Sequence, residues 1–239
     1  ASWNAIVKGG SDKFFAAACI TGAAGLISLF FLPFLPLPHP SSWIFIGLST
    51  ITQIFYMSLV AAAYKSGDMS EAYPIMRGTP PLLVALVSAP LIGEAIGWGG
   101  WVGIILICSG VLAMALEARR RNGGTSSKTA LLALANAGFI ATYTIIDGVG
   151  VRASGNTLSY TLWLFLINAF PLGCWALYRE PDRFLNYVRN RWRPSLIGGI
   201  GTLASYGLAL WAMTMAPIAV VAALRETAIL FGVLISALI

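Results

Sequence analysis

Apolar stretches separated by short polar connections recur along the whole chain. Each stretch approaches the roughly 20 residues with which a helix crosses about 30 Å of hydrocarbon. Because lipid offers no hydrogen-bonding partner, the backbone groups of each stretch must be satisfied within it, which favours helices over strands. We therefore expect membrane spans over residues 1–7, 14–32, 43–63, 72–92, 100–116, 130–146, 158–177, 195–215 and 218–239.

Composition excludes a soluble globular protein. The 239 residues are 58% hydrophobic and 10% charged, with a mean hydropathy of +0.80, whereas a soluble domain carries about 25% charged residues. The formal charge of +6 does not predict a nucleic-acid partner, since the basic residues lie in connections between apolar stretches. Twelve of the 15 follow odd-numbered spans, which the positive-inside rule assigns to the cytoplasmic side.

Cysteine and histidine do not form a metal or catalytic pattern. Cys19, Cys108 and Cys174 lie far apart, each inside an apolar stretch, and His39 is the only histidine. A metal site or a nucleophile–base pair needs several such groups in matched positions. We therefore expect no cofactor, no metal and no catalytic residues. We interpret the cysteines as small hydrophobic residues of the helix core.

The chain contains an internal repeat. The stretch from Arg77 reads Arg-Gly-Thr-Pro-Pro-Leu-Leu-Val-Ala-Leu-Val-Ser-Ala, and the stretch from Arg225 reads Arg-Glu-Thr-Ala-Ile-Leu-Phe-Gly-Val-Leu-Ile-Ser-Ala. The repeating unit holds five spans, an odd number, so two copies insert in opposite senses, as in alternating-access transporters. We expect repeats over residues 1–121 and 128–239, joined by a polar linker. Both ends of the chain read as clipped, with a first span shortened and a tenth missing.

Several stretches resemble the EamA family of the drug/metabolite transporter superfamily. These are Tyr73-Pro-Ile-Met-Arg-Gly-Thr-Pro-Pro-Leu-Leu-Val-Ala, the Gly93-Glu94 step, Trp101-Val-Gly-Ile-Ile-Leu-Ile, and Ala216-Pro-Ile-Ala-Val-Val-Ala-Ala-Leu-Arg. The resemblance implies an all-α membrane protein, a ten-helix inverted-repeat (5+5) bundle of which about nine spans are present. It also implies export or exchange of small solutes such as amino acids. Many members carry basic residues after the second span, where this chain has His39 and neither Lys nor Arg, so the orientation stays open.

Arginines inside apolar spans are the sharpest candidates for a site. An Arg at the centre of a membrane helix costs about 2.5–3.5 kcal/mol, so it faces protein or water. Its guanidinium matches carboxylate or phosphate. Arg77 and Arg225 are therefore predicted to contact an anionic substrate or to act as a gate. The alternatives are snorkelling to the interface, or pairing with Glu226, Asp147 or helix carbonyls.

Further candidates accompany the arginines. The run from Gly78 to Pro81 is predicted to break the fourth span, because proline cannot donate a backbone hydrogen bond, and broken helices beside a charge indicate a binding site. Asp147 and Glu226 are candidates for proton coupling. The candidates for substrate binding or gating are Arg77, Arg225, Asn4, Trp3, Tyr73, Thr79, Tyr143, Tyr206 and Thr227.

The sequence as a whole predicts a multi-pass transporter that moves a small metabolite by alternating access. An amino acid or small organic anion is the expected cargo, by export or antiport, across a bacterial inner membrane. A phosphorylated or phosphonate metabolite is the alternative cargo, and an intramembrane enzyme or a receptor is the alternative class. The expected partners are the lipid bilayer and a small-molecule substrate. Whether the protein is a monomer or a homodimer stays open.

Overall fold

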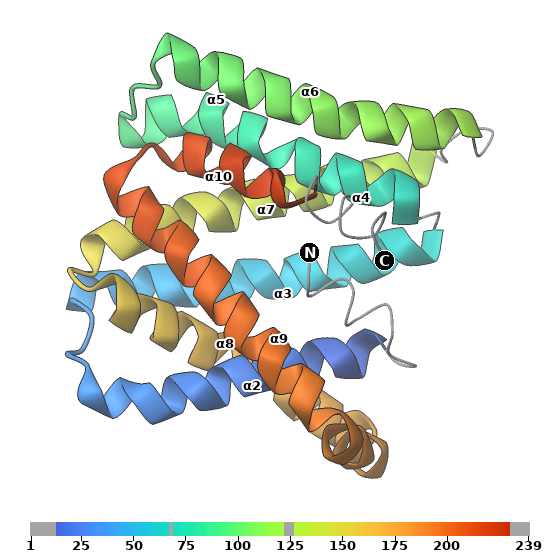
Figure 1. Cartoon of the computed structure of the whole chain (residues 1–239), viewed down its shortest axis with the longest axis vertical. Helices are drawn as coiled ribbons and strands as arrows, with labels where there is room; N and C mark the ends of the chain where they lie inside the picture. The colour runs from blue at the N-terminus through green and yellow to red at the C-terminus, as the bar shows by residue number, and fades with distance from the viewer. Residues whose placement is uncertain (1–12, 67–68, 122–126, 230–239) are drawn as a thin grey trace. The chain divides into compact units, whose positions relative to one another are not determined.

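The computed structural model describes residues 13–66, 69–121 and 127–229. All the regular elements in these ranges are helices (Figure 1). They are α2 (Lys13–Phe31), η1 (Leu32–Phe34), η2 (Pro40–Ser42), α3 (Trp43–Ser66), α4 (Met69–Gly78), α5 (Pro80–Ile92), α6 (Trp98–Arg121), α7 (Ser127–Ala153), α8 (Thr157–Arg179), α9 (Pro181–Met215) and α10 (Ile218–Glu226).

Seven helical segments in the described part of the chain are long and apolar enough to cross a membrane. They correspond to the second through eighth predicted spans, with α4 and α5 together forming the fourth. The predicted first span and the last ten residues of the predicted ninth, 230–239, lie outside the described residues. The total of ten helices therefore stays a prediction.

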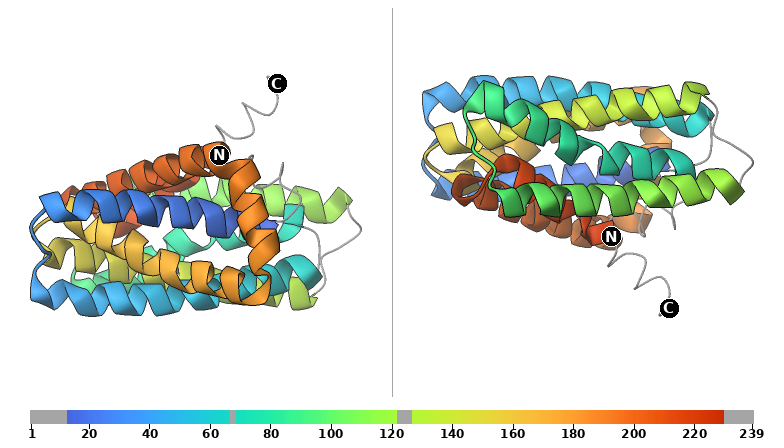
Figure 2. Two further views of the ribbon diagram at one scale, coloured as in Figure 1. Left: turned by 90° about the horizontal axis from the view of Figure 1, so that it is seen from below. Right: turned by 90° about the horizontal axis from the view of Figure 1, so that it is seen from above.

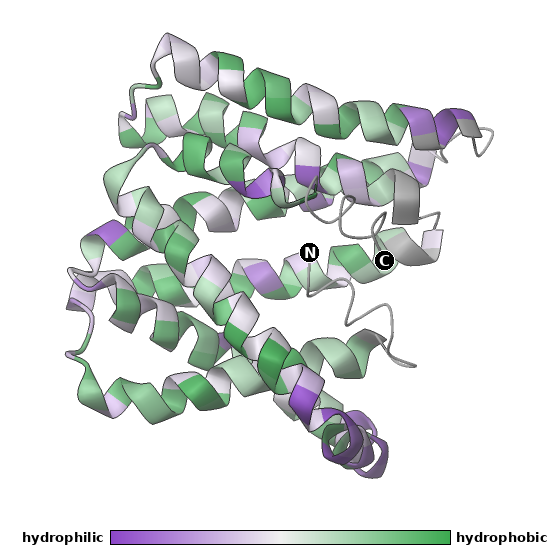
Figure 3. Ribbon diagram, in the orientation of Figure 1, coloured by the Kyte–Doolittle hydropathy of each residue, from purple (hydrophilic) through white to green (hydrophobic). Residues whose placement is uncertain are grey.

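Side chains on the outer faces of these helices are apolar. Leu26, Leu86, Leu106 and Leu131 are each more than 60% exposed. Figure 3 shows apolar residues along most of the helix lengths, with hydrophilic residues at the end of α6 and at the start of α9. Such a surface is unfavourable in water and suits contact with lipid. The protein is thus an integral, multi-pass membrane protein.

The chain divides into two compact units. Unit 1 comprises residues 1–46 and 150–211, and unit 2 comprises residues 47–149 and 212–239. These units do not coincide with the sequence repeats, because each takes helices from both halves of the chain. Unit 1 contains α2, α8 and most of α9, and unit 2 contains α4, α5, α6, α10 and most of α3 and α7.

Unit 1 is held together by close helix contacts and a cluster of rings. A Cβ at Gly25 would lie 2.5 Å from the Cβ of Ala169, and one at Gly199 would lie 2.9 Å from the backbone nitrogen of Ala24. Only glycine permits such approaches of α8 and α9 to α2, which strengthen van der Waals packing where no hydrophobic effect operates. Phe15 packs against the rings of Phe184 and Tyr187 at 5.6 and 6.0 Å.

In unit 2, α3, α4 and α7 share one buried cluster. Ala63, Ala72, Met76, Ala133, Ile140 and Tyr143 form it. Nearby, Phe55 of α3 stacks on Phe139 of α7. The helices α5, α6 and α10 pack against one another beside α4. This arrangement brings α10, from the end of the chain, against helices of the first half.

The structure corrects two details of the sequence analysis. The sixth span was predicted over residues 130–146, but α7 runs from Ser127 to Ala153, so Asp147 lies inside the helix. The connection after the seventh span is also helical, since α9 begins at Pro181 and bends at Arg191.

Candidate functional site

A helix break in unit 2 places the first candidate residues. The fourth span is interrupted at Thr79, as predicted, with α4 ending at Gly78 and α5 beginning at Pro80. Pro80 and Pro81 have no N–H, so the carbonyls of Met76 and Arg77 lose the donors that a regular helix provides four residues later. Polar backbone atoms and a guanidinium therefore lie together within an apolar span. Figure 1 shows α10 beside α5, in the same unit as α4.

Arg77, just before this break, forms an ion pair with Glu226 of α10. Its Nε lies 3.1 Å from Oε2 of Glu226, and the two side chains are 25% and 6% exposed. Both atoms are buried, and their geometry makes no hydrogen bond. The pair is thus held by charge attraction, while hydrogen-bonding capacity on each side is unused. This pairing is one of the alternatives that the sequence left open.

Arg77 and Glu226 occupy the same position counted from the first residue of their helices. Arg77 is the ninth residue of α4, counted from Met69, and Glu226 is the ninth residue of α10, counted from Ile218. The sequence repeat matches Arg77 with Arg225, whereas the helix starts match it with Glu226. Glu226 also lies within electrostatic reach of Arg225, which precedes it on α10. The cluster of three groups carries a net charge of +1.

Three tyrosines lie within electrostatic reach of Arg77. Tyr73 is four residues before Arg77 on α4, and therefore on the same face of the helix. Tyr143 of α7 is buried, and its ring meets that of Tyr56 of α3 edge-on at 5.8 Å. Each ring combines an apolar body with a polar hydroxyl. The charged pair is accordingly bordered by groups that contact both apolar and polar parts of a small molecule.

Glu94 positions α10, and with it Glu226. The N–H of Ile218 donates to both carboxylate oxygens of Glu94, at 3.1 and 3.0 Å. The residue before Ile218 is Pro217, which provides no side-chain cap, so Glu94 caps the helix from the connection between α5 and α6. Gly93, with φ +72°, ends α5 and turns the chain toward this contact. A carboxylate at a helix N-terminus is favoured by the helix dipole.

Asn136 is a buried polar residue that the sequence analysis did not single out. It is fully buried on α7, and both atoms of its amide have no hydrogen-bond partner in the described residues. Ala133, Asn136, Ile140 and Tyr143 follow one another along α7 at steps of three or four residues. Asn136 therefore shares the face of α7 that packs on α3 and α4. A single amide within the apolar span 130–146 is the signal that would have found it, because such groups are costly in lipid.

The other predicted residues have diverse surroundings. Asp147 is fully buried in α7, with partners of its own. Thr79 lies at the break without capping α5 through its side chain. The Thr227 hydroxyl donates to the carbonyl of Leu224 at 2.6 Å. Tyr206 belongs to unit 1, where its ring meets Phe165 edge-on at 5.9 Å. Trp3 and Asn4 lie outside the described residues.

The charged and polar side chains around Arg77 in unit 2 are suited to binding a ligand. In the part of the chain that the structure describes, no three His, Cys, Asp or Glu side chains gather as metal ligands. A guanidinium, a carboxylate and tyrosine hydroxyls recognise charge and hydrogen-bonding groups on a ligand. Because Arg77 is paired with Glu226, a ligand anion that approaches Arg77 competes with the carboxylate of Glu226 for it.

A comparison with family models matches almost the whole chain. The EamA-like transporter family model matches twice, over residues 5–116 and again over residues 127–239. No curated protein sequence matches the chain.

Proposed function

The chain belongs to the EamA-like transporter family and is therefore a membrane transporter, and we propose that it moves a small amino acid or organic anion through the site around Arg77. The observation that carries this proposal is the buried Arg77–Glu226 ion pair beside the broken fourth span. A substrate carboxylate takes the place of the Glu226 carboxylate on Arg77, and the exchange opens and closes the site during alternating access. Export or antiport across a bacterial inner membrane is the transport mode that we propose.

The charge of the cluster supports a monoanionic or zwitterionic substrate. Arg77 and Arg225 together contribute +2, and Glu226 reduces the sum to +1. One carboxylate neutralises this charge. A zwitterion leaves the sum at +1, as it is without substrate, and its ammonium group finds a partner in the released Glu226. A phosphate ester with charge near −2 leaves the site with an excess of negative charge, which is unfavourable away from water. The phosphorylated cargo is therefore the second candidate.

Binding is tested by the melting temperature of the purified full-length protein with amino acids, organic acids and phosphate esters. A ligand at 100 times its dissociation constant stabilises the folded protein by about 2.7 kcal/mol. We expect an amino acid or monocarboxylate to raise the melting temperature of the wild type, and to lose this effect in Arg77→Ala. Arg152→Ala is the matched control, since Arg152 is an exposed arginine near the end of α7.

Two outcomes contradict the proposal. A ligand that stabilises the wild type and Arg77→Ala equally binds elsewhere, and Arg77 then has a structural role. Stabilisation by phosphate esters alone indicates the phosphorylated cargo instead. Uptake of the stabilising solute into proteoliposomes then separates transport from an enzymatic or receptor function. Members of this family are generally not enzymes, and we propose no catalytic role for any residue.

We also propose that a carboxylate of unit 2 couples transport to protons. Glu226 and Asp147 are buried on α10 and α7, and a carboxylate within a membrane protein often serves as a proton carrier. Glu226 is the stronger candidate, because a monoanionic substrate that takes its place on Arg77 frees it to take up a proton. We expect Glu226→Gln to abolish uptake driven by a pH gradient and to retain substrate binding, measured by thermal stabilisation. Unchanged pH-driven uptake in Asp147→Asn/Glu226→Gln excludes this coupling.

A further inference from the structure

The helical segment 181–193, at the start of α9, carries an unusual concentration of charge. Residues 179–193 hold five arginines and two acidic residues, a net charge of +3. The segment is separated from the apolar part of α9 by a bend at Arg191, with φ −124° and ψ 19°. Pro194 follows the bend and cannot donate a hydrogen bond to the carbonyl of Asn190. The backbone therefore changes direction where the composition changes.

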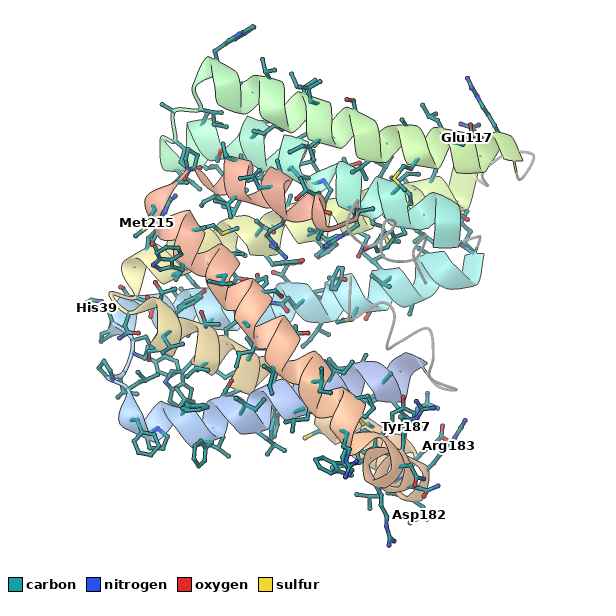
Figure 4. All side chains as sticks on the ribbon, viewed as in Figure 1. His39, Glu117, Asp182, Arg183, Tyr187 and Met215 are labelled. Carbon is teal, nitrogen blue, oxygen red and sulfur yellow. The ribbon has the colours of Figure 1, made fainter. Side chains whose placement is uncertain are left out.

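The segment lies across the spans of unit 1 rather than along them. The left view of Figure 2 shows it crossing the axes of α2 and α8 at one end of these helices. Since α2 and α8 span the membrane, a helix that crosses them at their ends runs along the membrane surface. Figure 4 shows Asp182, Arg183 and Tyr187 on this part of α9. Phe184 and Tyr187 pack on Phe15 of α2 and fix the segment in place.

One side of the segment is apolar and open. Leu185 and Trp192 are 55% and 53% exposed, and Val188 is 36% exposed. At 100° per residue Leu185 and Val188, which both precede the bend, lie on one side of the helix, and Asn186 and Asn190 fall toward the opposite side. Exposed apolar residues beside arginines, on a helix that lies along a membrane surface, are typical of an interfacial helix.

Two arginine side chains on the segment have no partner within the described residues. Arg183 is paired with Glu180 at 2.8 Å and lies over the ring of Phe15, and Arg193 lies over the ring of Trp192. The exposed side chains of Arg189 and Arg191 make no ion pair, hydrogen bond or ring contact within the described residues. Their guanidinium groups match phosphate oxygens in geometry and charge.

We propose that the segment 181–193 is an interfacial helix that binds the phosphate groups of anionic phospholipids through Arg189 and Arg191, with Leu185, Val188 and Trp192 inserted among the acyl chains. The positive charge of the segment complements the negative surface of a leaflet rich in anionic lipid. The bend at Arg191 then connects the lipid-bound segment to the long apolar part of α9. This inference is independent of the cargo proposed above.

The test measures the melting temperature of the full-length protein in nanodiscs of phosphatidylcholine, with and without 30 mol% phosphatidylglycerol, about a third of the lipid. We expect the anionic lipid to raise the melting temperature of the wild type by about 5 °C, since each arginine at a charged surface adds to stability. Arg189→Gln/Arg191→Gln should abolish this rise. The matched control is Arg119→Gln/Arg120→Gln, which removes the same charge from the exposed end of α6.

Three results overturn the proposal. The first is an equal loss in the control variant, which indicates a response to net charge alone. The second is an equal rise with inorganic phosphate in phosphatidylcholine nanodiscs, which indicates a site for free phosphate rather than lipid. The third comes from spin labels on Val188→Cys and Asn186→Cys, in a Cys174→Ser background. An interfacial helix requires that oxygen dissolved in the bilayer reaches the label at position 188 more readily than the label at position 186. Equal access of oxygen to both labels overturns the proposal.

Discussion

Neutralising one partner of the Arg77–Glu226 pair is expected to lower the free energy of unfolding by about 3 kcal/mol, near the lower limit for a broken buried ion pair. Arg77→Met leaves the buried carboxylate of Glu226 without its nearest cation, and Glu226→Met leaves a guanidinium whose Nε is buried. The lower limit applies because a quarter of the Arg77 side chain is accessible and can be hydrated. Thermal denaturation of the purified variants in one detergent measures the effect.

The double variant Arg77→Met/Glu226→Met separates stability from function. Removing both charges leaves neither member of the pair buried without its partner, so the stability of this variant is expected to return to within about 1 kcal/mol of the wild type. Transport in proteoliposomes should remain absent, because the substrate carboxylate has lost its partner. A double variant as unstable as the single variants would show that the two residues are not energetically coupled. A double variant that transports at the wild-type rate would exclude the pair from the substrate site.

Removing the carboxylate of Glu94 is expected to destabilise α10 by about 2 kcal/mol, the range of a hydrogen bond to a charged group. Glu94→Ala leaves the N–H of Ile218 without its acceptor, and Pro217 offers no replacement. Glu94→Gln keeps one acceptor oxygen and loses the charge, so its effect should be about half as large. Hydrogen exchange at the amides of the first turn of α10 measures the loss directly, and thermal denaturation measures its effect on the whole protein.

Glu180→Gln is the control for this prediction. Glu180 also accepts a hydrogen bond, from Arg183, but the pair is exposed, with side chains 48% and 64% accessible. Exposed ion pairs contribute about 0.2–1 kcal/mol, and this one lies outside α10, so Glu180→Gln should leave exchange in α10 unchanged. If Glu94→Ala exchanges as slowly as the wild type at Ile218, the cap has no energetic role. Because Glu226 lies eight residues further along α10, loss of the cap should also weaken its contact with Arg77.

Part of the candidate site was predictable from residue type alone. A charged side chain within an apolar span is costly, so Arg77, Arg225, Asp147 and Glu226 stand out in the amino-acid sequence. The break at Thr79 follows from the missing N–H groups of Pro80 and Pro81, a property of the covalent chain. The Gly93-Glu94 step was identifiable as a family feature. Its physical role was not, because the partner at Ile218 lies 124 residues away.

The sequence by itself determined that the chain is a helical membrane protein and where seven of its spans lie, because apolar length and backbone hydrogen bonding act locally. Only the tertiary structure decided which charges meet. Arg77 reaches Glu226 rather than Asp147, because α10 packs against α5 and α6, next to the end of α4 that carries Arg77. It also decided that the basic connection after α8 is a bent helix, since its path depends on the packing of Phe184 and Tyr187 on Phe15. Such contacts join residues far apart in the chain, and no local pattern encodes them.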